Sequence, residues 1–199
     1  MRKGYCRVRP VFQTAQQVRA DIESAFPGLV GTKWLPKSPY DDTYQCIAWA
    51  AGDTSHKWWP IYFPPICYWP QGVPYDETVN GFIRAFETLG YKRSQSRGFE
   101  FGWQKVAIYA KNDGTVTHMA RQHFFGRGWL SKPGDLADIL HLHLEGIESD
   151  PSPMASGYGT VAQILERSWW IAARFGLFRC WWAAFQFWLF RIKEMLDLT

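Results

Sequence analysis

Two side chains that could form a catalytic pair, a thiol and an imidazole, lie far apart in the sequence. Cys46 opens residues 46–52, a short apolar run of good helix formers closed by glycine, which places the thiol at a predicted helix N-terminus. His118 lies on a predicted strand directly after a tight hairpin, where the backbone can aim its side chain at a helix end. A helix N-terminus and a nearby imidazole both favour the thiolate form of cysteine. The pattern therefore predicts that Cys46 attacks as a nucleophile and that His118 acts as general base and then as general acid.

A third polar side chain usually orients the imidazole in such a site. Ser131 lies on the predicted strand that follows His118, and Gln122 and Asp138 are also close to it in the sequence. The sequence does not choose among these three residues, and Ser131 and Gln122 are the first candidates.

Four further residues near this pair in the sequence are candidates for contacts with a substrate. Tyr44 and Gln45 precede the cysteine, and with the Cys46 backbone N–H they would stabilise an oxyanion. Arg121 and Lys132 would bind an acidic or carboxylate group, although charges at these positions more often solvate a sheet edge. The predicted reaction is hydrolysis or acyl transfer at an amide of a peptide or protein. A peptide bond, an isopeptide bond and a glutamine side chain remain equal alternatives.

Hydrophobic periodicity predicts the helices that must position these residues. Residues 14–26 form an amphipathic helix with apolar residues four apart, ended by Pro-Gly. Residues 78–90 keep a helical period through five apolar positions and end at a glycine. Between them, residues 58–70 contain Trp-Trp-Pro and Tyr-Trp-Pro, which exclude a regular helix and indicate either an aromatic cleft or a satellite core.

Antiparallel strands are predicted after these helices. Residues 105–110 and 115–120 flank an Asn-Asp-Gly turn, which is the pattern of a β-hairpin, and residues 124–132 predict a third strand. Residues 135–140 predict a helix, with Asp135 as its N-cap and a histidine near its C-terminus.

The order of helices followed by antiparallel strands predicts an α+β fold in which N-terminal helices pack on a small antiparallel sheet. We expect an N-terminal helical segment over residues 1–33, an α+β domain over residues 34–167 and a C-terminal aromatic, amphipathic helix over residues 168–199. An aromatic content of 18%, with 12 Trp, together with only 17 Gly and 12 Pro, excludes a disordered, collagenous or coiled-coil chain.

Five short motifs mark the central segment. They are Tyr-x-Cys-Ile-Ala-Trp-Ala at 44–50, Trp-Trp-Pro at 58–60, Tyr-Trp-Pro-x-Gly-Val-Pro at 68–74, Lys-Val-Ala-Ile-Tyr at 105–109 and Thr-His-x-Ala-Arg-Gln at 117–122. Together they resemble an uncharacterised bacterial domain family of unknown function, and the resemblance covers residues 34–167. Gln45 stands where that family usually has Asn, and Pro133 where it usually has Leu.

A more distant resemblance comes from the order of the site residues along the chain. A cysteine at a helix start, a histidine on a strand and a polar residue on the next strand resemble the papain-like fold, in particular its NlpC/P60 and transglutaminase-like branch. This resemblance implies a papain-like architecture and a cysteine-dependent hydrolase.

Charge and cysteine usage narrow the remaining function classes. The net charge is only +4 and the basic residues are scattered, so we expect no nucleic-acid partner. The four cysteines are widely spaced, which indicates reduced thiols, and no export signal follows the N-terminus, so we expect a cytoplasmic protein. His141 and His143 would diverge on the predicted helix, so we expect no metal and no other cofactor.

The C-terminal segment, residues 168–199, is exceptionally rich in Trp and Phe. Arg174 and Arg179 would lie inside any membrane span and would each cost about 2.5–3.5 kcal/mol, so we do not expect a transmembrane helix. We expect a helix that packs on the domain, joins copies in a homo-oligomer or lies at a membrane surface. This segment motivates an alternative function, a non-catalytic interaction module that binds a partner protein or a membrane surface, which would make the protein peripheral to a membrane.

Overall fold

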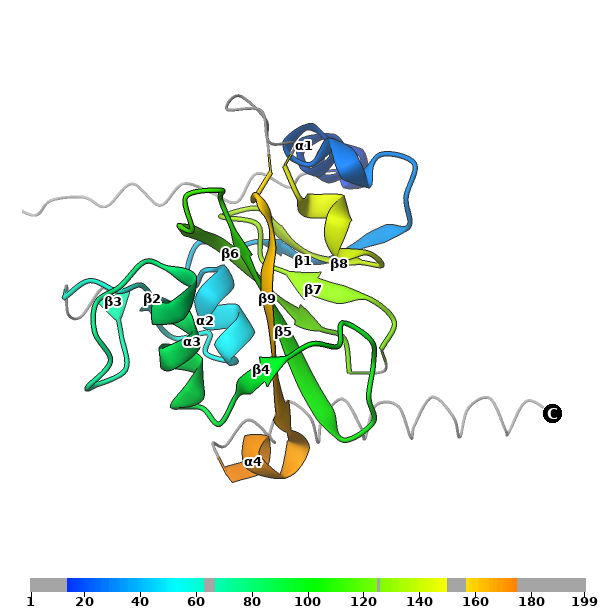
Figure 1. The fold of residues 1–199 in the computed structure, drawn as a ribbon. Coiled ribbons are helices and arrows are strands. Elements are labelled where there is room, and N and C mark those ends of the chain that lie inside the picture. Colours follow the sequence, from blue (N-terminus) through cyan, green and yellow to red (C-terminus); the bar gives the residue numbers. More distant parts are fainter. Residues whose placement is uncertain (1–13, 63–66, 125, 150–156, 175–199) are drawn as a thin grey trace, which may run out of the picture.

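The architecture is a seven-stranded sheet with helices on both faces (Figure 1). The computed structural model describes residues 14–62, 67–124, 126–149 and 157–174, with backbone alone for 172–174. Every neighbouring strand pair in this sheet is antiparallel, so the predicted α+β class is confirmed. In sheet order, the strands are β1 (Trp34–Tyr40), β8 (Ala137–His141), β7 (Trp129–Ser131), β6 (Val116–Gln122), β5 (Trp103–Ala110), β9 (Thr160–Ser168) and β4 (Lys92–Ser94).

Two hydrophobic cores lie on opposite faces of the sheet. On one face, α2 (Cys46–Ala51) and α3 (Val79–Glu87) cover a core that contains Ile108 and Met119. On the other face, α1 (Ala15–Ala25) and the short 3-10 helices η1 (Pro27–Leu29) and η2 (Leu144–Ile147) cover a core that contains Tyr109 and Ala120. Because successive side chains of a strand point to opposite faces, one residue step along β5 or β6 moves a side chain from one core to the other. These surfaces are called the α2 face and the α1 face below.

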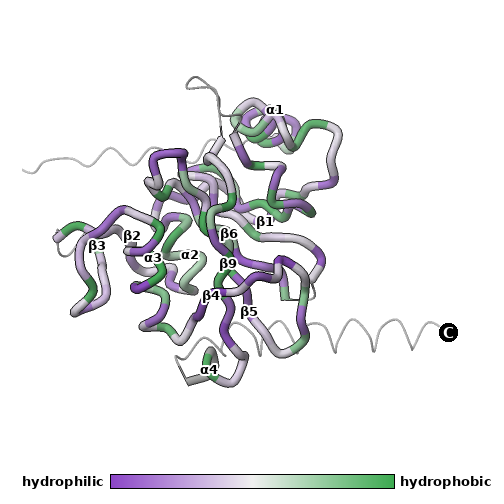
Figure 2. Tube along the Cα trace, in the orientation of Figure 1, coloured by the Kyte–Doolittle hydropathy of each residue, from purple (hydrophilic) through white to green (hydrophobic). Residues whose placement is uncertain are grey.

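The predicted helices form where their capping residues place them. Thr14 caps α1 in a capping box with Gln17, and Thr78 caps α3 by accepting a hydrogen bond from the Gly81 backbone N–H. Gly52 ends α2 with a φ of 87°, in the left-handed region that glycine adopts without strain. Figure 2 shows hydrophobic residues along α2, consistent with its burial against the sheet.

The predicted hairpin is confirmed, because β5 and β6 pair in antiparallel register around a turn over residues 111–114. The third predicted strand is shorter than expected and is limited to β7. The Pro-rich aromatic stretch forms β2 (Lys57–Trp58) and β3 (Cys67–Tyr68), which pair in parallel as a separate two-stranded sheet.

The helix predicted over residues 135–140 is wrong. This stretch contributes β8, which is paired on both sides by β1 and β7. Ala137, Ile139 and His141 alternate toward the α1 face, so a period of two, not a helical period, buries its apolar side chains. Asp135 is therefore not a helix cap, and His141 is not near a helix C-terminus.

The structure does not confirm two further expectations. The papain-like architecture is not confirmed, because the sheet is larger than predicted and helices cover both of its faces. The C-terminal segment begins as α4 (Trp169–Arg174), and the remainder of the predicted aromatic helix lies outside the described residues. Within the described ranges, no helix combines the length and the apolar character needed to cross a bilayer.

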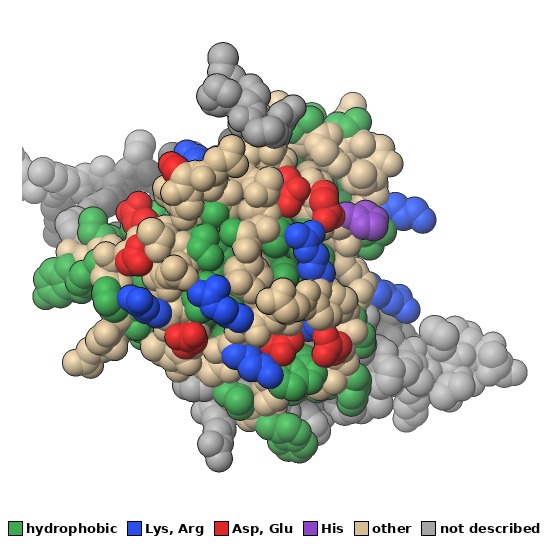
Figure 3. Space-filling model, in the orientation of Figure 1, with side chains coloured by type: hydrophobic (Ala, Val, Ile, Leu, Met, Phe, Trp, Pro, Cys, Tyr) green, Lys and Arg blue, Asp and Glu red, His purple; other side chains and the backbone are tan. Residues whose placement is uncertain are grey.

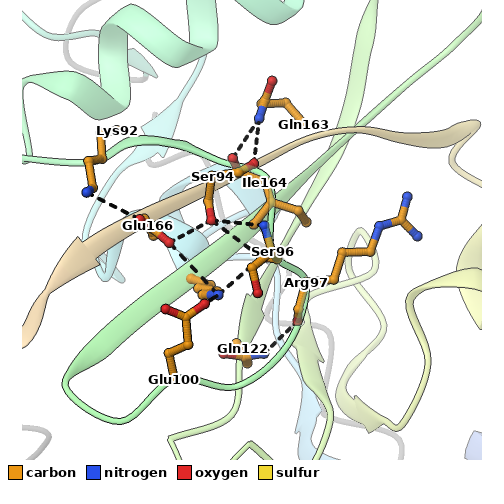
Figure 4. Close-up of polar contacts among 10 residues, drawn as sticks. Lys92, Ser94, Ser96, Arg97, Glu100, Gln122, Gln163, Ile164 and Glu166 are labelled. Carbon is orange, nitrogen blue, oxygen red and sulfur yellow. Dashed lines mark hydrogen bonds and ion pairs between the residues drawn. The ribbon is translucent and has the colours of Figure 1, made fainter.

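A polar network attaches the loop after β4 to the α1 face of the sheet (Figure 4). The buried Lys105 ammonium donates hydrogen bonds to the Ser96 carbonyl at 3.2 Å and to Glu100, and it lies 3.9 Å from Glu166 Oε2. The Ser94 hydroxyl donates to the same Glu166 oxygen at 2.6 Å. A fully buried ammonium is therefore neutralised by two carboxylates, which satisfies the requirement that buried charges be paired.

Removing the central cation of this network should destabilise the fold. We expect Lys105→Met to lower the free energy of unfolding by about 1–3 kcal/mol, because Glu100 and the Ser96 carbonyl lose a charged donor and Glu166 loses a nearby cation. Urea denaturation measures the difference. Lys111→Met, at an exposed position in the β5–β6 turn, is the matched control and should change stability by less than about 0.5 kcal/mol. Equal stability of the Lys105→Met variant and the unmodified protein would contradict a structural role for the network.

Candidate functional site

Cys46 is the first residue of α2, as the sequence predicts, and its N-cap is Gln45. The residue is partly exposed and packs against the core of the α2 face. Burial raises the pKa of the Cys46 thiol to about 11, although the backbone N–H groups of Met119, Ile47 and Cys46 and the charge of Lys132 all act to lower it. The sulfur thus lies among hydrogen-bond donors but remains protonated at neutral pH.

His118 lies on the opposite face of the sheet from Cys46. Its neighbour Met119 packs into the core of the α2 face, and His118 contacts Tyr109 and Tyr158, which belong to the α1 face. The imidazole is 0% exposed and stacks on the Tyr158 ring with 4.1 Å between ring centroids. In the part of the chain that the structure describes, neither ring nitrogen has a hydrogen-bond partner, so the predicted bond to Cys46 is not formed. Burial also holds the pKa of His118 well below its usual value.

The residues predicted to orient His118 have other partners. The Ser131 hydroxyl lies 2.9 Å from His141 Nε2, and His141 Nδ1 lies 2.8 Å from the His143 carbonyl. Because a carbonyl only accepts, Nδ1 must carry the proton and Nε2 accepts from Ser131. Gln122 donates to the Arg97 carbonyl at 3.1 Å. Both predicted residues share the α1 face with His118, but neither bonds to it.

The Ser131–His141 pair has the hydrogen-bond geometry of a nucleophile and its base, and it was not predicted. Ser131 is 0% exposed and His141 1% exposed, so a substrate cannot reach the hydroxyl in this conformation. We therefore interpret the pair as a satisfied polar contact within the sheet. The signal that could have revealed it is the alternation of Ile139 and His141 along a strand, which the helix prediction for this stretch concealed.

The predicted substrate-contact residues gather on the α2 face, the same face as Cys46. The Tyr44 hydroxyl donates to Asp138 Oδ2 at 2.9 Å, and the Lys132 ammonium lies 5.5 Å from the Tyr44 ring centroid. The Arg121 guanidinium lies 4.3 Å from the centre of the Trp49 ring, on the helix that Cys46 begins. These contacts form a largely buried cationic and aromatic cluster beside the N-terminus of α2.

Charges in this cluster are only partly compensated. Lys132 is fully buried and donates to the carbonyls of Gly134 and Leu136 at 2.6 and 2.8 Å, and burial lowers its pKa. Burial also raises the pKa of Asp138, whose Oδ1 has no hydrogen-bond partner. The remaining predicted residue, Gln45, donates its side-chain amide to the Trp58 carbonyl and thereby ties α2 to the β2 strand. An amide engaged in this way supports the fold and is not directed at an oxyanion above Cys46.

A metal site is not assembled in the described residues. No group of three or more His, Cys, Asp or Glu side chains there is arranged to hold a metal ion. Although His141 lies on a strand, its Nδ1 is bonded to the His143 backbone and its Nε2 to Ser131, so both of its nitrogens are already occupied.

The fold and the cluster define an α+β protein with a mostly antiparallel sheet and a cysteine at the N-terminus of a buried helix. Residues 36–166 match the family described as a domain of unknown function (DUF7689), and the chain belongs to this family. The predicted resemblance to such a family is thereby confirmed, whereas the papain-like resemblance gains no support. Comparisons with curated proteins and with solved structures returned no match.

The environment of Cys46 predicts slow alkylation. We expect the rate of iodoacetamide modification of Cys46 to rise with pH toward a midpoint near 11, because burial disfavours the thiolate. Mass spectrometry of the Cys46 peptide over a pH series measures this rate, and the partly exposed Cys67 is the internal control. A Cys46 midpoint below the ordinary thiol value of about 8.5 would show that the thiol is activated and would contradict this expectation.

Proposed function

We propose that this protein is a non-catalytic interaction module that binds an anionic membrane surface through the region around α4. The observation that carries the proposal is the exposure of two large aromatic side chains, Phe101 at 82% and Trp170 at 85%. Ile171 and Phe99 are also substantially exposed. These four residues define the α4 surface. Hydrophobic side chains lie at the lower end of the molecule in the view of Figure 3, where Figure 1 places α4.

The α4 surface is held rigidly against the sheet. The ring of Trp169 packs between Phe101 and Phe124, with centroid distances of 4.8 and 4.7 Å. The Trp169 backbone N–H donates to the Gly102 carbonyl at 2.9 Å, which anchors the start of α4 to the turn before β5. Anchoring by one tryptophan thus leaves the next, Trp170, directed to solvent.

Charge favours an anionic membrane over other occupants. From residue 168 to residue 193 the sequence contains Arg174, Arg179, Arg191 and Lys193 and no acidic residue. Beside α4 in the fold, the exposed Lys92 ammonium lies 4.5 Å from the Trp103 ring centre. Tryptophan and phenylalanine interspersed with cations are typical of segments that bind at the headgroup level of anionic bilayers. A protein of this kind would be cytoplasmic and peripheral to the membrane.

A second candidate function, a cysteine-dependent amide hydrolase or acyltransferase acting on a peptide or protein, is favoured by a different observation. Tyr44, Arg121 and Lys132 share the α2 face with Cys46, as a substrate site there would require. His118 does not contact the thiol, so in this alternative the charge of Lys132 supplies the stabilisation of the thiolate. The alkylation series above separates the two functions, since catalysis requires a thiolate near neutral pH.

Vesicle flotation tests the membrane proposal. We expect Trp170→Ala and Phe101→Ala each to weaken binding to phosphatidylglycerol-containing vesicles by roughly threefold to thirtyfold, because each removes part of an aromatic side chain's transfer free energy. The Trp170 side chain is exposed, so Trp170→Ala should keep the stability of the fold, whereas Phe101→Ala also removes the ring contact with Trp169. Tyr62→Ala, at a side chain 75% exposed near β2, is the matched control and should bind as the unmodified protein does.

Other occupants of the α4 surface give distinct results in the same series. Vesicle binding that is unaffected by Trp170→Ala and Phe101→Ala would refute the membrane proposal. A protein that fails to float but forms a homo-oligomer sensitive to Trp170→Ala, measured by sedimentation velocity, would identify a second copy as the occupant.

A further inference from the structure

Three leucines lie in one row across the sheet. Leu35 on β1 pairs with Leu140 on β8, and Leu140 pairs in turn with Leu130 on β7. Their sequence neighbours Trp34 and Ile139 pack into the core of the α1 face, so the three leucines project from the opposite side of the sheet, the α2 face. These three residues are called the leucine row below.

The helices of the α2 face do not cover the leucine row. The core beneath α2 and α3 contains side chains of β5, β6 and β9 but none of β1, β7 or β8 among the described residues. Leu35 is 57% exposed, and Leu130 and Leu140 are partly exposed. An apolar sheet face is normally buried against a second layer of structure. Three aligned leucines without such a layer therefore indicate a surface that another molecule covers.

Positive charges flank the leucine row. Lys37 follows its β1 member by two residues, Arg121 pairs with its β7 member, and Arg127 lies in the hairpin between β6 and β7. Burial lowers the pKa of His123 in the same hairpin, and the charges of these three cations lower it further. Lys37 and Arg127 are exposed and form no ion pair among the described residues. The rim of the row is therefore positively charged and suits an acidic partner.

We propose that the leucine row and its flanking cations are the docking site for an acidic amphipathic helix of a partner protein. Such a helix presents apolar side chains at helical spacing to the leucines and places Asp or Glu beside them, opposite Lys37 and Arg127. Because α2 already covers the neighbouring part of the same sheet face, the docked helix extends an existing layer. The inference is independent of the membrane proposal, which concerns the α4 surface.

Other occupants fit this surface less well. Pro36 and Pro39 lack the N–H groups that an added strand would need at the β1 edge. A second copy in a two-fold interface would bring the same cations face to face. The chain's own segments 1–13 and 175–193 contain basic residues and no acidic residue, so they do not complement the charged rim. A flat bilayer would contact Leu35 far more than the less exposed Leu130 and Leu140.

A synthetic helix tests the proposal on the full chain. The probe is a fluorescently labelled peptide of about 18 residues, long enough to form a helix, with leucines at helical spacing and glutamates beside them. Fluorescence anisotropy should show saturable binding that weakens as salt is added. A peptide with lysines in place of the glutamates is the control and should bind roughly tenfold more weakly or worse. No saturable binding of the acidic peptide, or equal binding of both peptides, would overturn the proposal.

Two substitutions locate the bound peptide. Leu35→Gln should weaken its affinity roughly fivefold or more, because part of a leucine's transfer free energy is lost. Lys37→Gln should weaken it about twofold to fivefold by removing one exposed ion pair. The matched controls, which should keep full affinity, are Val30→Gln, at a side chain 60% exposed beside η1, and Lys111→Gln in the β5–β6 turn. All four side chains are exposed, so the variants should stay folded, and peptide binding unchanged by Leu35→Gln would refute the site.

The same variants identify a different occupant of the leucine row. Self-association in sedimentation velocity that Leu35→Gln abolishes would assign the row to a second copy and overturn the proposal. Loss of vesicle flotation in Leu35→Gln would assign it to a bilayer, with the same consequence. Trp170→Ala should leave peptide binding unchanged, so the membrane proposal and this inference can fail separately.

Discussion

Strand β6 lies between the two cores, and its side chains alternate between them with the period of two that a pleated strand imposes. Met119 and Arg121 therefore face α2, whereas His118, Ala120 and Gln122 face α1. The pairing of β6 with β5 and β7 carries this alternation across the sheet, so Ser131 joins the α1 face opposite Ala120. The same register separates Cys46 from the imidazole predicted to activate it, and a shift of one residue would reverse this arrangement.

Burial of polar side chains is the second constraint on the molecule. Each buried cation is compensated by a different set of acceptors. Lys105 is neutralised by Glu100 and Glu166, and Lys132 is held by two backbone carbonyls. Arg167 has neutral acceptors for two of its donors and none for a third. His118 needs no counter-charge, because burial lowers its pKa and opposes its protonation. Among the described residues, neither Arg167 nor Lys132 has a carboxylate within ion-pair distance, so neutral acceptors alone take their hydrogen bonds.

The two candidate surfaces of the protein lie at different ends of the α2 face. The N-terminus of α2 presents Cys46 near Tyr44 and Lys132, where the sulfur is shielded and protonated. At the other end, Arg167 and Tyr91 lie behind the loop that packs on α4, and the exposed aromatic residues follow directly. Arg121 connects these two regions, because its charge acts on both Asp138 and Tyr91.

The sequence alone determined the local elements whose signals are short in range. The helix starts near residues 14 and 78, the glycine that ends α2 and the turn between β5 and β6 were all readable, because each depends on a few neighbouring residues. The family motifs around Cys46 were readable for the same reason. Strand β8 was misread as a helix because a short apolar run does not reveal its period, and β1 was missed because Pro36 and Pro39 are tolerated only at the sheet edge it occupies. Which face each side chain occupies was decided only in the tertiary structure. Strand register depends on long-range pairing, so the separation of Cys46 from His118 and the meeting of Arg167 with Tyr91 carry no local signal in the chain.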